Sequence, residues 1–382
     1  MVIYLSFGDQ PSGVYKSQVT DFVNFLEAES GHNVWLVAFI SIRGFFNNRQ
    51  QIRQHAPQAI VLPMLPKLRN WRMNRFLLFV ILRLQSKRPQ LIMGRNVLAT
   101  LLALEAKKKG LTNSVLFDGR GAISAEWKEY SVVQDPYLEA SIKNWEKQAV
   151  LETDWRIAVS NQLVRFWQSE FVYQKGKESV IPCTIDQSYS RVLINTSQID
   201  AARKKIGFPT TGVTLVYSGS VAGWQSGNLL SSLLEQLLNN QPELQVLFLS
   251  KETPFISSLA NNYPNRIKAC FVAPEEVPSY LLGCDYGLLI REDTVTNQVA
   301  APVKFAEYLA CGLKVLISPN LGDYSGYVSE EKLGFLSDSL PPILQKLSLE
   351  DKTRMQAFAL EKFSKSRYLT DYLQIIQQTS IH

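Results

Sequence analysis

The fold of this 382-residue chain is constrained most by an alternation of two kinds of segment along its whole length. Short runs rich in apolar and β-branched residues alternate with longer segments in which apolar residues recur at helical spacing. Such alternation is typical of parallel sheets covered by helices on both faces, so the sequence predicts an α/β fold. The strands we expect are 2–7, 34–40, 59–62, 91–94, 114–118, 156–159, 213–217, 246–249, 267–271, 286–289 and 315–317. The helices we expect are 15–29, 71–85, 98–109, 137–152, 228–239, 277–282 and 303–311.

The chain divides near residue 182. A short strand meets Pro182 there, and a polar stretch follows before the next expected strand. A length of 382 residues also favours two domains, at roughly 100–200 residues each. We expect doubly wound, Rossmann-like domains at 1–182 and 183–365, with 366–382 a helix that packs back on the first. Ligands of such sheets bind beyond the carboxyl ends of the strands, which predicts a site in a cleft between the domains.

Composition excludes several classes of protein. The longest apolar run, 76–82, is far shorter than the ~20 residues that span a bilayer, so we expect neither a spanning helix nor a signal peptide. The four cysteines lie far apart without paired spacing, and there are only three histidines. This pattern argues against a zinc site or a disulfide framework and favours a reducing, cytoplasmic compartment.

Positive charge is concentrated in residues 41–90, which contain ten Lys and Arg and no Asp or Glu. The block indicates an anionic partner: a lipid surface, a nucleic acid or an acidic substrate. Cations alternate with aromatic residues in 68–79, as in helices that lie in a membrane interface. We expect 43–88 to bind an anionic membrane surface, and a nucleic acid is the less favoured partner. The apolar run 76–82 has an alternative role as the core face of a helix that covers the first sheet.

The most informative motif lies in the second half. It combines Ile290-Arg291-Glu292 with Ala301-Pro302-Val303-Lys304-Phe305-Ala306-Glu307-Tyr308-Leu309-Ala310-Cys311-Gly312. Pro302 suits the first turn of a helix and Gly312 suits its end, so Lys304 and Glu307 share one face. A cation beside free backbone N–H groups can bind phosphate, and a carboxylate one turn further can accept from a ribose diol. The alternative is an ordinary solvent-exposed ion pair.

This segment resembles the donor-site signature of retaining glycosyltransferases of the GT-B fold, in the large family four. Further resemblances, in the expected order along the chain, are the glycine loop 8–13, the segment 31–34, the crossover 180–186, Tyr217-Ser218-Gly219-Ser220, and Ala273-Pro274. The resemblance implies two Rossmann-like domains that face a cleft, a nucleotide-diphosphate sugar as donor, retention of anomeric configuration, and no metal or other cofactor.

The resemblance also implies roles for individual residues. Lys304 would bind the diphosphate of the donor, Glu307 the ribose hydroxyls, and Arg291 a phosphate or the sugar. Gly13, at the end of the first glycine loop, would lie against the donor phosphates. The strand end with Ser218, Gly219 and Ser220 would complete the donor site.

Two departures from the family pattern bear on the donor site. Many relatives carry a glutamate eight residues before the equivalent of Glu307, where this chain has Val299. Asn297 and Gln298 are the nearest polar substitutes, and their amides could bind sugar hydroxyls without charge. Relatives also often carry a basic pair after the equivalent of Gly219, whereas 220–225 contains no cation.

A second motif, Asp118-Gly119-Arg120-Gly121, follows an expected strand, and Glu126 comes shortly after it. The glycines allow a sharp turn at the carboxyl end of the strand, which would bring Asp118 and Arg120 to the cleft. This variant resembles a subset of the family that is linked to surface-polysaccharide assembly. In this interpretation Asp118 accepts from the transferred sugar, Arg120 meets a phosphate or an acidic acceptor, and Glu126 orients the acceptor hydroxyl. The alternative is an Asp–Arg pair that only ties the turn.

Together these motifs predict transfer of a sugar from a nucleotide-diphosphate sugar to a glycan or lipid-linked acceptor. Two alternatives stay open. One is an epimerase or hydrolase of nucleotide sugars on the same fold, and the other is a non-catalytic protein that binds a sugar nucleotide or a nucleic acid.

Overall fold

The computed structural model describes residues 1–65, 68–219 and 227–379. The chain forms two compact units, each with its own core. The first is Met1–Thr184 together with Lys365–His382, and the second is Ile185–Ser364. In the described part of the chain, no helix combines the length and the apolarity needed to cross a membrane.

The first unit is built on a seven-stranded, wholly parallel sheet with the order β3-β2-β1-β4-β5-β6-β7. The chain winds outward from β1 in one direction and from β4 in the other, so the order reverses between these two strands. Their carboxyl ends are the place where such sheets bind ligands. The strands are β1 (Val2–Phe7), β2 (Val34–Ser41), β3 (Ile60–Met64), β4 (Leu91–Arg95), β5 (Ser114–Gly119), β6 (Trp155–Ala158) and β7 (Glu178–Val180).

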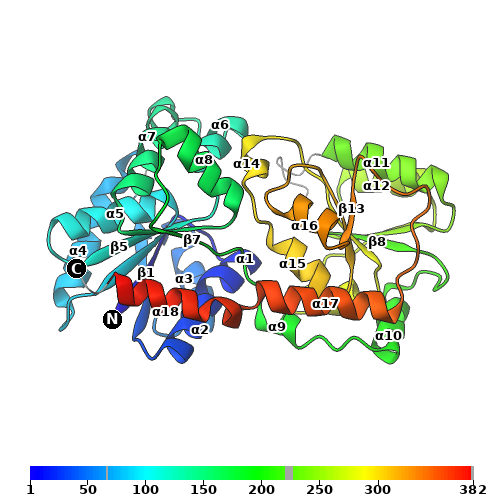
Figure 1. Cartoon of the computed structure of the whole chain (residues 1–382), viewed down its shortest axis with the longest axis horizontal. Helices are drawn as coiled ribbons and strands as arrows, with labels where there is room; N and C mark the ends of the chain where they lie inside the picture. Colours follow the sequence, from blue (N-terminus) through cyan, green and yellow to red (C-terminus); the bar gives the residue numbers. More distant parts are fainter. Residues whose placement is uncertain (66–67, 220–226, 380–382) are drawn as a thin grey trace. The chain divides into compact units, whose positions relative to one another are not determined.

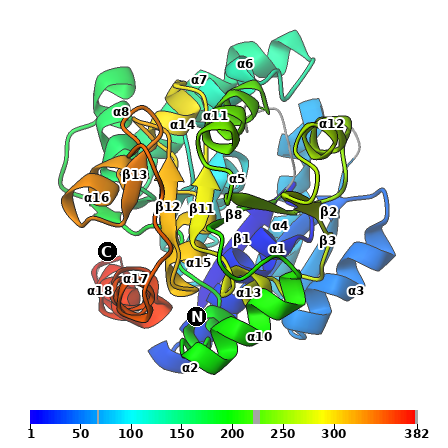
Figure 2. The same cartoon turned by 90° about the vertical axis from the view of Figure 1, so that its right-hand side faces the viewer.

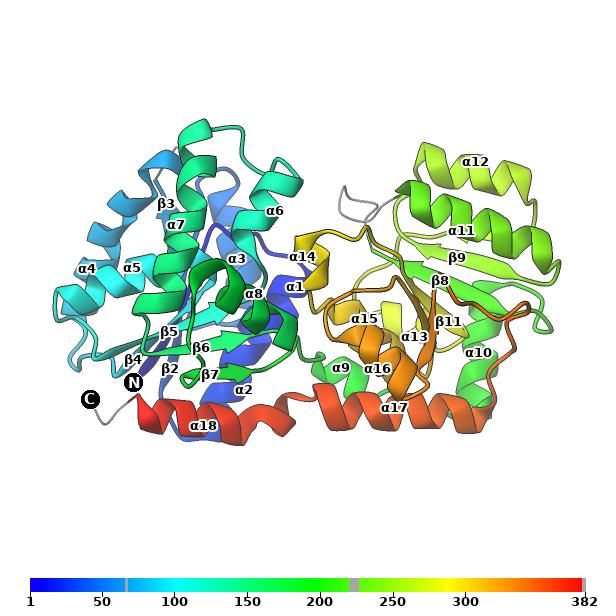
Figure 3. The ribbon, with the colours of Figure 1, turned by 45° about the horizontal axis from the view of Figure 1, so that its top comes forward.

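Helices cover both faces of this sheet, so its central strands are nearly continuous apolar runs, and every residue of β1 is buried. The last helix packs beside α2, where the rings of Tyr372 and Phe22 lie 4.9 Å apart (Figures 1 and 3). The helices are α1 (Gly13–Tyr15), the π-helix η1 (Lys16–Thr20), α2 (Asp21–Ser30), α3 (Phe45–His55), the 3-10 helix η2 (Leu68–Asn74), α4 (Arg75–Leu84), α5 (Asn96–Lys108), α6 (Ile123–Glu129), α7 (Pro136–Glu152), α8 (Asn161–Phe171), the 3-10 helix η3 (Lys365–Tyr368) and α18 (Leu369–Gln378).

The second unit is built on a six-stranded parallel sheet with the order β10-β9-β8-β11-β12-β13. Figure 2 shows α11 and α12 on one face of this sheet and α13 and α15 on the other. The strands are β8 (Thr214–Ser218), β9 (Gln245–Leu249), β10 (Ile267–Ala269), β11 (Tyr286–Leu289), β12 (Lys314–Ile317) and β13 (Gly334–Leu336). The helices are α9 (Gln187–Ser190), α10 (Thr196–Ile206), α11 (Gly227–Asn240), α12 (Pro254–Asn262), α13 (Val277–Leu281), α14 (Val295–Gln298), α15 (Val303–Ala310), α16 (Tyr324–Glu330) and α17 (Leu349–Phe363).

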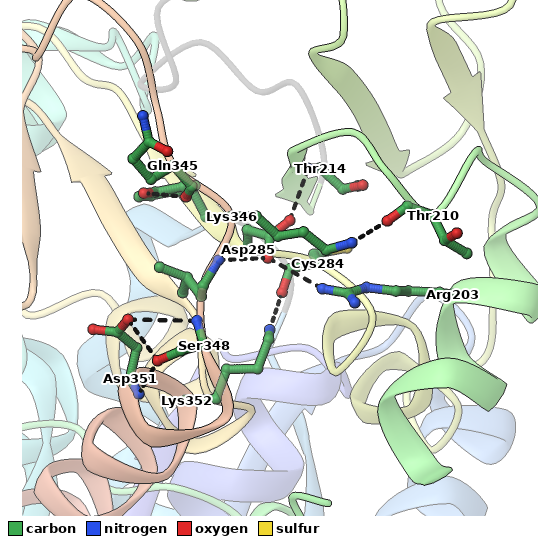
Figure 4. Close-up of polar contacts among 12 residues, drawn as sticks. Arg203, Thr210, Thr214, Cys284, Asp285, Gln345, Lys346, Ser348, Asp351 and Lys352 are labelled. Atoms are coloured by element: carbon green, nitrogen blue, oxygen red, sulfur yellow. Dashed lines mark hydrogen bonds and ion pairs between the residues drawn. The ribbon is translucent and has the colours of Figure 1, made fainter. Parts of the chain in front are cut away.

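A buried polar network holds the amino ends of these strands (Figure 4). The carboxylate of Asp285 accepts hydrogen bonds from the backbone of Thr214 at 3.0 Å and of Leu347 at 3.2 Å, and it pairs with Arg203 at 3.4 Å. Beside it, the buried Lys352 of α17 donates to the carbonyl of Cys284. The network joins α10 and α17 to the sheet at the edge opposite the one where ligands bind.

The predicted α/β class with two Rossmann-like parallel sheets is confirmed. Several local expectations are wrong. The polar stretch 186–205 contains the helices α9 and α10, because side-chain caps such as Asn195 and one buried helical face favour helix despite the high polarity. The expected helix 71–85 begins as the 3-10 helix η2 and becomes α-helical only at Arg75. Strand β13 and helices α3, α8, α12, α16 and α17 were not expected.

Candidate functional site

In the second unit, Lys304 and Glu307 lie on one face of α15, as their spacing predicts. The Nζ atom of Lys304 lies 2.7 Å from Oε2 of Glu307. The side chain of Glu307 is only 10% exposed and that of Lys304 is 29% exposed. A carboxylate this buried, paired with a cation that still reaches solvent, differs from the ordinary exposed ion pair that the sequence left open.

A third residue, which no sequence pattern indicates, contacts Glu307 of this pair. Tyr189 of α9 is buried, and its hydroxyl donates a hydrogen bond to Glu307. Burial and the nearby carboxylate both raise the pKa of Tyr189, so the phenol stays protonated and acts as a donor. Asp186 fixes α9 by accepting from the backbone N–H of Ser188 at 2.7 Å.

Arg291 lies in the loop after β11, and Asn297 lies in the short helix α14 that follows this loop. The backbone N–H of Arg291 donates to Ser318 at 2.7 Å, and its guanidinium donates to Oδ1 of Asn297 at 3.3 Å. Asn297 is buried, and its amide nitrogen donates to the Glu292 carbonyl at 3.1 Å. The Asn297 amide therefore holds Arg291 in place, and a contact with a sugar hydroxyl would require it to exchange these bonds.

The end of β8 is tied to the same helix. The backbone N–H of Ser218 donates to the hydroxyl of Tyr308 in α15 at 3.0 Å. Gly219 follows with φ 136°, a conformation that favours glycine, and a Cβ atom there would meet nothing within 4 Å. The predicted donor residues Ser218 and Lys304 are thus carried by elements joined through Tyr308. Ser220, also predicted, lies outside the described residues.

In the first unit, the carboxyl ends of β1, β4 and β5 bring charged side chains together. Asp118 is buried and accepts hydrogen bonds from the hydroxyl of Tyr4 at 2.5 Å and from Arg120 at 2.9 Å. Arg95 is the register partner of Asp118 in the neighbouring strand β4. It lies 3.4 Å from the Tyr4 hydroxyl and 3.4 Å from a carboxylate oxygen of Asp9. We call these five residues the Asp118 cluster.

Burial and neighbouring charges shift the pKa values of the cluster in different ways. Burial disfavours a charged Arg120, but the Asp118 carboxylate outweighs this and raises the pKa of Arg120 above its ordinary value. Burial and Asp118 raise the pKa of Tyr4, so its phenol stays protonated and donates a hydrogen bond to Asp118. Burial also raises the pKa of Asp9, against the opposing effect of Arg95. Two guanidinium groups and two carboxyl groups therefore share one largely buried site.

Unused hydrogen-bonding capacity marks the same site. Within residues 1–65, 68–219 and 227–379, five of the buried side-chain atoms without a hydrogen-bond partner lie here: Asp9 Oδ2, Arg95 Nε, Asn96 Oδ1, Asp118 Oδ1 and Arg120 Nε. Asn96 also has φ 63°, a sparsely populated conformation for a residue other than glycine. Unsatisfied buried groups and backbone strain in one place are typical of sites that bind a polar ligand.

Two predicted residues of this unit have other surroundings. Gly13 begins α1, after the Ser12 side chain that caps it, and space for a Cβ is open there. Glu126 lies in α6, and among the described residues no hydrogen bond or ion pair joins it to the Asp118 cluster. Burial raises its pKa, and it interacts electrostatically with Glu146 of α7. The structure thus brings Asp118 and Arg120 together but leaves Glu126 apart from them.

Glu146 fixes the segment that carries these residues. Its buried carboxylate accepts from the backbone N–H groups of Ile123 at 3.1 Å and Ser124 at 2.8 Å, at the start of α6. Burial raises the pKa of Glu146 to about 7. No group of three or more His, Cys, Asp or Glu side chains in the described part of the chain is arranged to hold a metal ion.

No protein-family model matches the sequence, and no curated protein sequence matches it. Solved structures do match. Sucrose-phosphate synthase from Thermosynechococcus elongatus has 13% identity and a TM-score of 0.70, with 99% of this chain and 98% of that one covered. Anabaena HepE, solved with UDP and glucose, has 14% identity and a TM-score of 0.67 over the same shares. UDP-GlcNAc 2-epimerase from Neisseria meningitidis has 14% identity and a TM-score of 0.55, with both chains fully covered.

These likenesses show that the chain has the GT-B fold, in which glycosyltransferases and nucleotide-sugar epimerases both occur. Identities of 13–14% show the fold alone. The reaction must therefore be argued from the side chains of this chain.

Proposed function

We propose that the protein is a glycosyltransferase that moves a sugar, with retention of configuration, from a nucleotide-diphosphate sugar to a glycan or lipid-linked acceptor. The observation that carries the proposal is the Lys304–Glu307 pair in α15, in which the carboxylate is nearly buried and also accepts from Tyr189 while the cation reaches solvent. The GT-B fold supports it, as does HepE, a structure of this fold that was solved with UDP and glucose. We expect no metal or other cofactor in the reaction.

The donor site works by exchange of partners. When the diphosphate binds, it replaces Glu307 as the partner of Lys304, and the released carboxylate accepts from the two ribose hydroxyls. Tyr189 keeps its hydrogen bond and holds Glu307 in position throughout. Lys304 and Arg291 then stabilise the charge that develops on the departing diphosphate, which is the main electrostatic contribution that this chain supplies.

The Asp118 cluster is proposed to position the acceptor or the transferred sugar. Several of its buried oxygen and nitrogen atoms make ion pairs but no hydrogen bond, so they can still accept from and donate to sugar hydroxyls. Arg120 and Arg95 suit an acceptor that carries a phosphate or carboxylate. Asp118→Asn and Arg120→Gln should therefore keep affinity for the nucleoside diphosphate and lose transfer. If both variants lose folding stability equally and keep their activity per folded molecule, Asp118 and Arg120 serve only to stabilise the turn after β5.

The setting we propose is the assembly of surface polysaccharide or glycoconjugate in the cytoplasm, at the inner face of the membrane. The ten cations of 41–90 support attraction of this chain to an anionic surface, although one of them, Lys67, lies outside the described residues.

A second candidate is a nucleotide-sugar epimerase, because an epimerase from Neisseria meningitidis shares the fold over both full chains. A screen of UDP-, GDP-, ADP- and dTDP-sugars by thermal stabilisation identifies the donor, since a bound ligand raises stability by RT ln(1 + [L]/Kd). The donor so found is then incubated with lipid-linked and glycan acceptors, and the products are identified by mass spectrometry and NMR. A new glycosidic bond with the donor's anomeric configuration supports the proposal. An isomerised sugar nucleotide would instead indicate an epimerase, and binding without any product would indicate a non-catalytic binding protein.

A further inference from the structure

A cavity of about 510 Å³ lies in the first unit, away from the carboxyl edge of its sheet. It opens between the segment η2–α4 and helix α5, with one residue from α7. Its size is within the ~300–1,000 Å³ typical of sites for small organic molecules. The lining residues are Trp71, Arg72, Arg75, Phe76, Phe79, Leu101, Leu104, Glu105, Lys108, Lys109 and Gln148.

The floor of this cavity is apolar. Phe79, Leu101 and Leu104 are buried side chains that face one another from α4 and α5. Trp71 is 1% exposed and packs edge-on against Trp145 of α7, with ring centroids 5.3 Å apart. A hydrocarbon chain could lie on this floor without displacing any hydrogen-bonded group.

The rim of the cavity is cationic. Arg75 is paired with Glu105 at 2.7 Å, and Lys108 with Glu152 at 3.1 Å. Arg72 and Lys109 are exposed, and within the described residues neither has a carboxylate at ion-pair distance. An anionic group at the mouth of the cavity would therefore meet two cations that no protein carboxylate neutralises.

The outward face of α4 continues the apolar floor onto the surface. Phe76, Val80 and Leu84 are 57%, 54% and 78% exposed, and their spacing of four places them on one side of α4. Met73, in the preceding 3-10 helix η2, is 51% exposed. We call these four residues the α4 stripe. Single exposed apolar residues are ordinary, but a stripe along a whole helix marks a surface that something covers. Phe76 belongs both to the stripe and to the cavity wall, so the two surfaces are continuous.

Charge complementarity indicates what covers the stripe. Exposed cations such as Arg69, Arg83 and Lys87 lie near it in the sequence, and 41–90 contains no acidic residue. A helix with an apolar face between cations is suited to the interface of an anionic bilayer. Nucleic acid fits less well, because Met73, Val80 and Leu84 offer no aromatic surface on which bases stack.

We propose that the cavity and the α4 stripe form one binding site for an anionic membrane lipid. The phosphate of the headgroup pairs with Arg72 and Lys109, the start of an acyl chain lies on the floor at Trp71, Phe79 and Leu104, and α4 rests in the bilayer interface. The site goes beyond long-range attraction of a charged segment, because it holds an individual lipid. It also stands whether or not the chain transfers sugars.

Vesicle co-sedimentation of the full chain tests the stripe. The vesicles are phosphatidylcholine with increasing fractions of phosphatidylglycerol. Replacing Phe76, Val80 and Leu84 together with Ser should weaken binding by at least ~10-fold, because interfacial binding scales with buried apolar area. The matched control replaces Leu193, Phe271 and Ile343 with Ser, which are 69%, 71% and 54% exposed in the second unit. Unchanged binding of the stripe variant, or an equal loss in the control, would overturn the proposal.

Soluble lipid tests the cavity itself. Dihexanoyl-phosphatidylglycerol below its micellar concentration should raise the melting temperature, and Arg72→Gln with Lys109→Gln should abolish this shift. The control pair Lys175→Gln with Lys177→Gln, also exposed cations, should keep it. An equal shift with inorganic phosphate would indicate a simple anion site, and salt-sensitive binding of DNA without vesicle binding would indicate a nucleic-acid surface. Either result overturns the lipid site. Nucleoside diphosphate affinity should be the same in all variants, so this outcome is independent of the donor site.

Discussion

At the scale of single residues, the proposed donor site centres on a buried carboxylate, Glu307, with two partners. If the diphosphate binds Lys304 as proposed, Lys304 leaves Glu307 on binding, whereas Tyr189 keeps its hydrogen bond. The ground state without ligand therefore keeps Glu307 neutralised, which avoids the cost of an unpaired buried charge. Replacing Lys304 and replacing Glu307 should therefore change different kinetic parameters.

Lys304→Ala should lower kcat by ~10²–10³-fold, because it removes a contact to the charge on the leaving diphosphate. Glu307→Ala should mainly raise the KM for the donor, because the ribose contact is made in the ground state as well. Initial rates over a range of donor concentrations separate the two parameters. Lys314→Ala is the control, since Lys314 is also paired with a carboxylate, Asp351 at 2.9 Å, but lies at the amino end of β12. Wild-type kinetics in both site variants would refute the donor-site assignment.

Tyr189→Phe should raise the donor KM by ~10-fold and change kcat much less. The variant keeps the ring and removes only the hydroxyl that holds Glu307, and a hydrogen bond to a charged group contributes about 1.5–3 kcal/mol. Tyr263→Phe, which removes a hydroxyl bonded to Asn239 on the surface, should leave both parameters unchanged. If Tyr189→Phe lowered stability and left the donor KM intact, the tyrosine would have only a packing role.

At the scale of elements, the loop after β5 is held by its neighbours. The turn Gly119–Arg120–Gly121 leads into α6, whose first N–H groups are satisfied by Glu146 from α7. In the second unit, the corresponding tie is Tyr308 of α15, which joins β8 and is seated against Gly287 of β11. A Cβ at residue 287 would lie 2.2 Å from the Tyr308 ring, so the close approach of α15 to the sheet requires glycine there.

The cap on α6 should make stability depend on pH. The pKa of Glu146 rises from 4.5 in a free chain to about 7 in the fold, so between these values the folded state holds a proton that the unfolded state has lost. The contribution is therefore fully present below pH 4.5 and is lost as the pH rises to 7. Its size is on the order of 3 kcal/mol in the free energy of unfolding. Urea unfolding at several pH values should show that Glu146→Gln flattens this part of the profile.

The exposed Glu139, on the same helix α7, supplies the control for this experiment. Glu139→Gln should keep the slope of the wild-type protein. A slope that survives in Glu146→Gln would mean that other carboxyl groups, such as Glu126, cause it.

The sequence predicts site residues where the residues of a pair lie close together along the chain. Lys304 and Glu307 are three residues apart on one helix, and Asp118 and Arg120 flank one glycine at a strand end, so both pairs were predicted. Arg95 also ends a strand, and the rule that led to Asp118 could have found it. Its contact with Asp118, however, requires β4 and β5 to be neighbours in register, which no local pattern reveals. Tyr189 lies in a single turn of helix inside a polar stretch, more than a hundred residues from Glu307.

At the scale of the whole molecule, the two units have separate cores and separate candidate sites. The parallel sheets are predictable because the central strands, such as β1, β5, β8 and β9, are buried on both faces and so form continuous apolar runs. Strand β13 could not be predicted in this way because it has only three residues, all half-buried, at the edge of its sheet. Two cores of similar size also imply that unfolding need not be one all-or-none transition.

This organisation gives a prediction about the intact chain. Six of the seven tryptophans lie in the first unit, and the seventh, Trp224, lies outside the described residues. In a Trp224→Phe variant, fluorescence therefore reports the first unit alone, while calorimetry reports both. If Lys304 and Glu307 bind the donor, its nucleoside diphosphate at about 100 times Kd should stabilise the second unit by about 2.7 kcal/mol and shift its calorimetric transition upward. The fluorescence transition should move much less. Equal shifts by both methods would mean that the nucleotide's binding energy is shared by the two units, and a larger fluorescence shift would place the nucleotide on the Asp118 cluster instead.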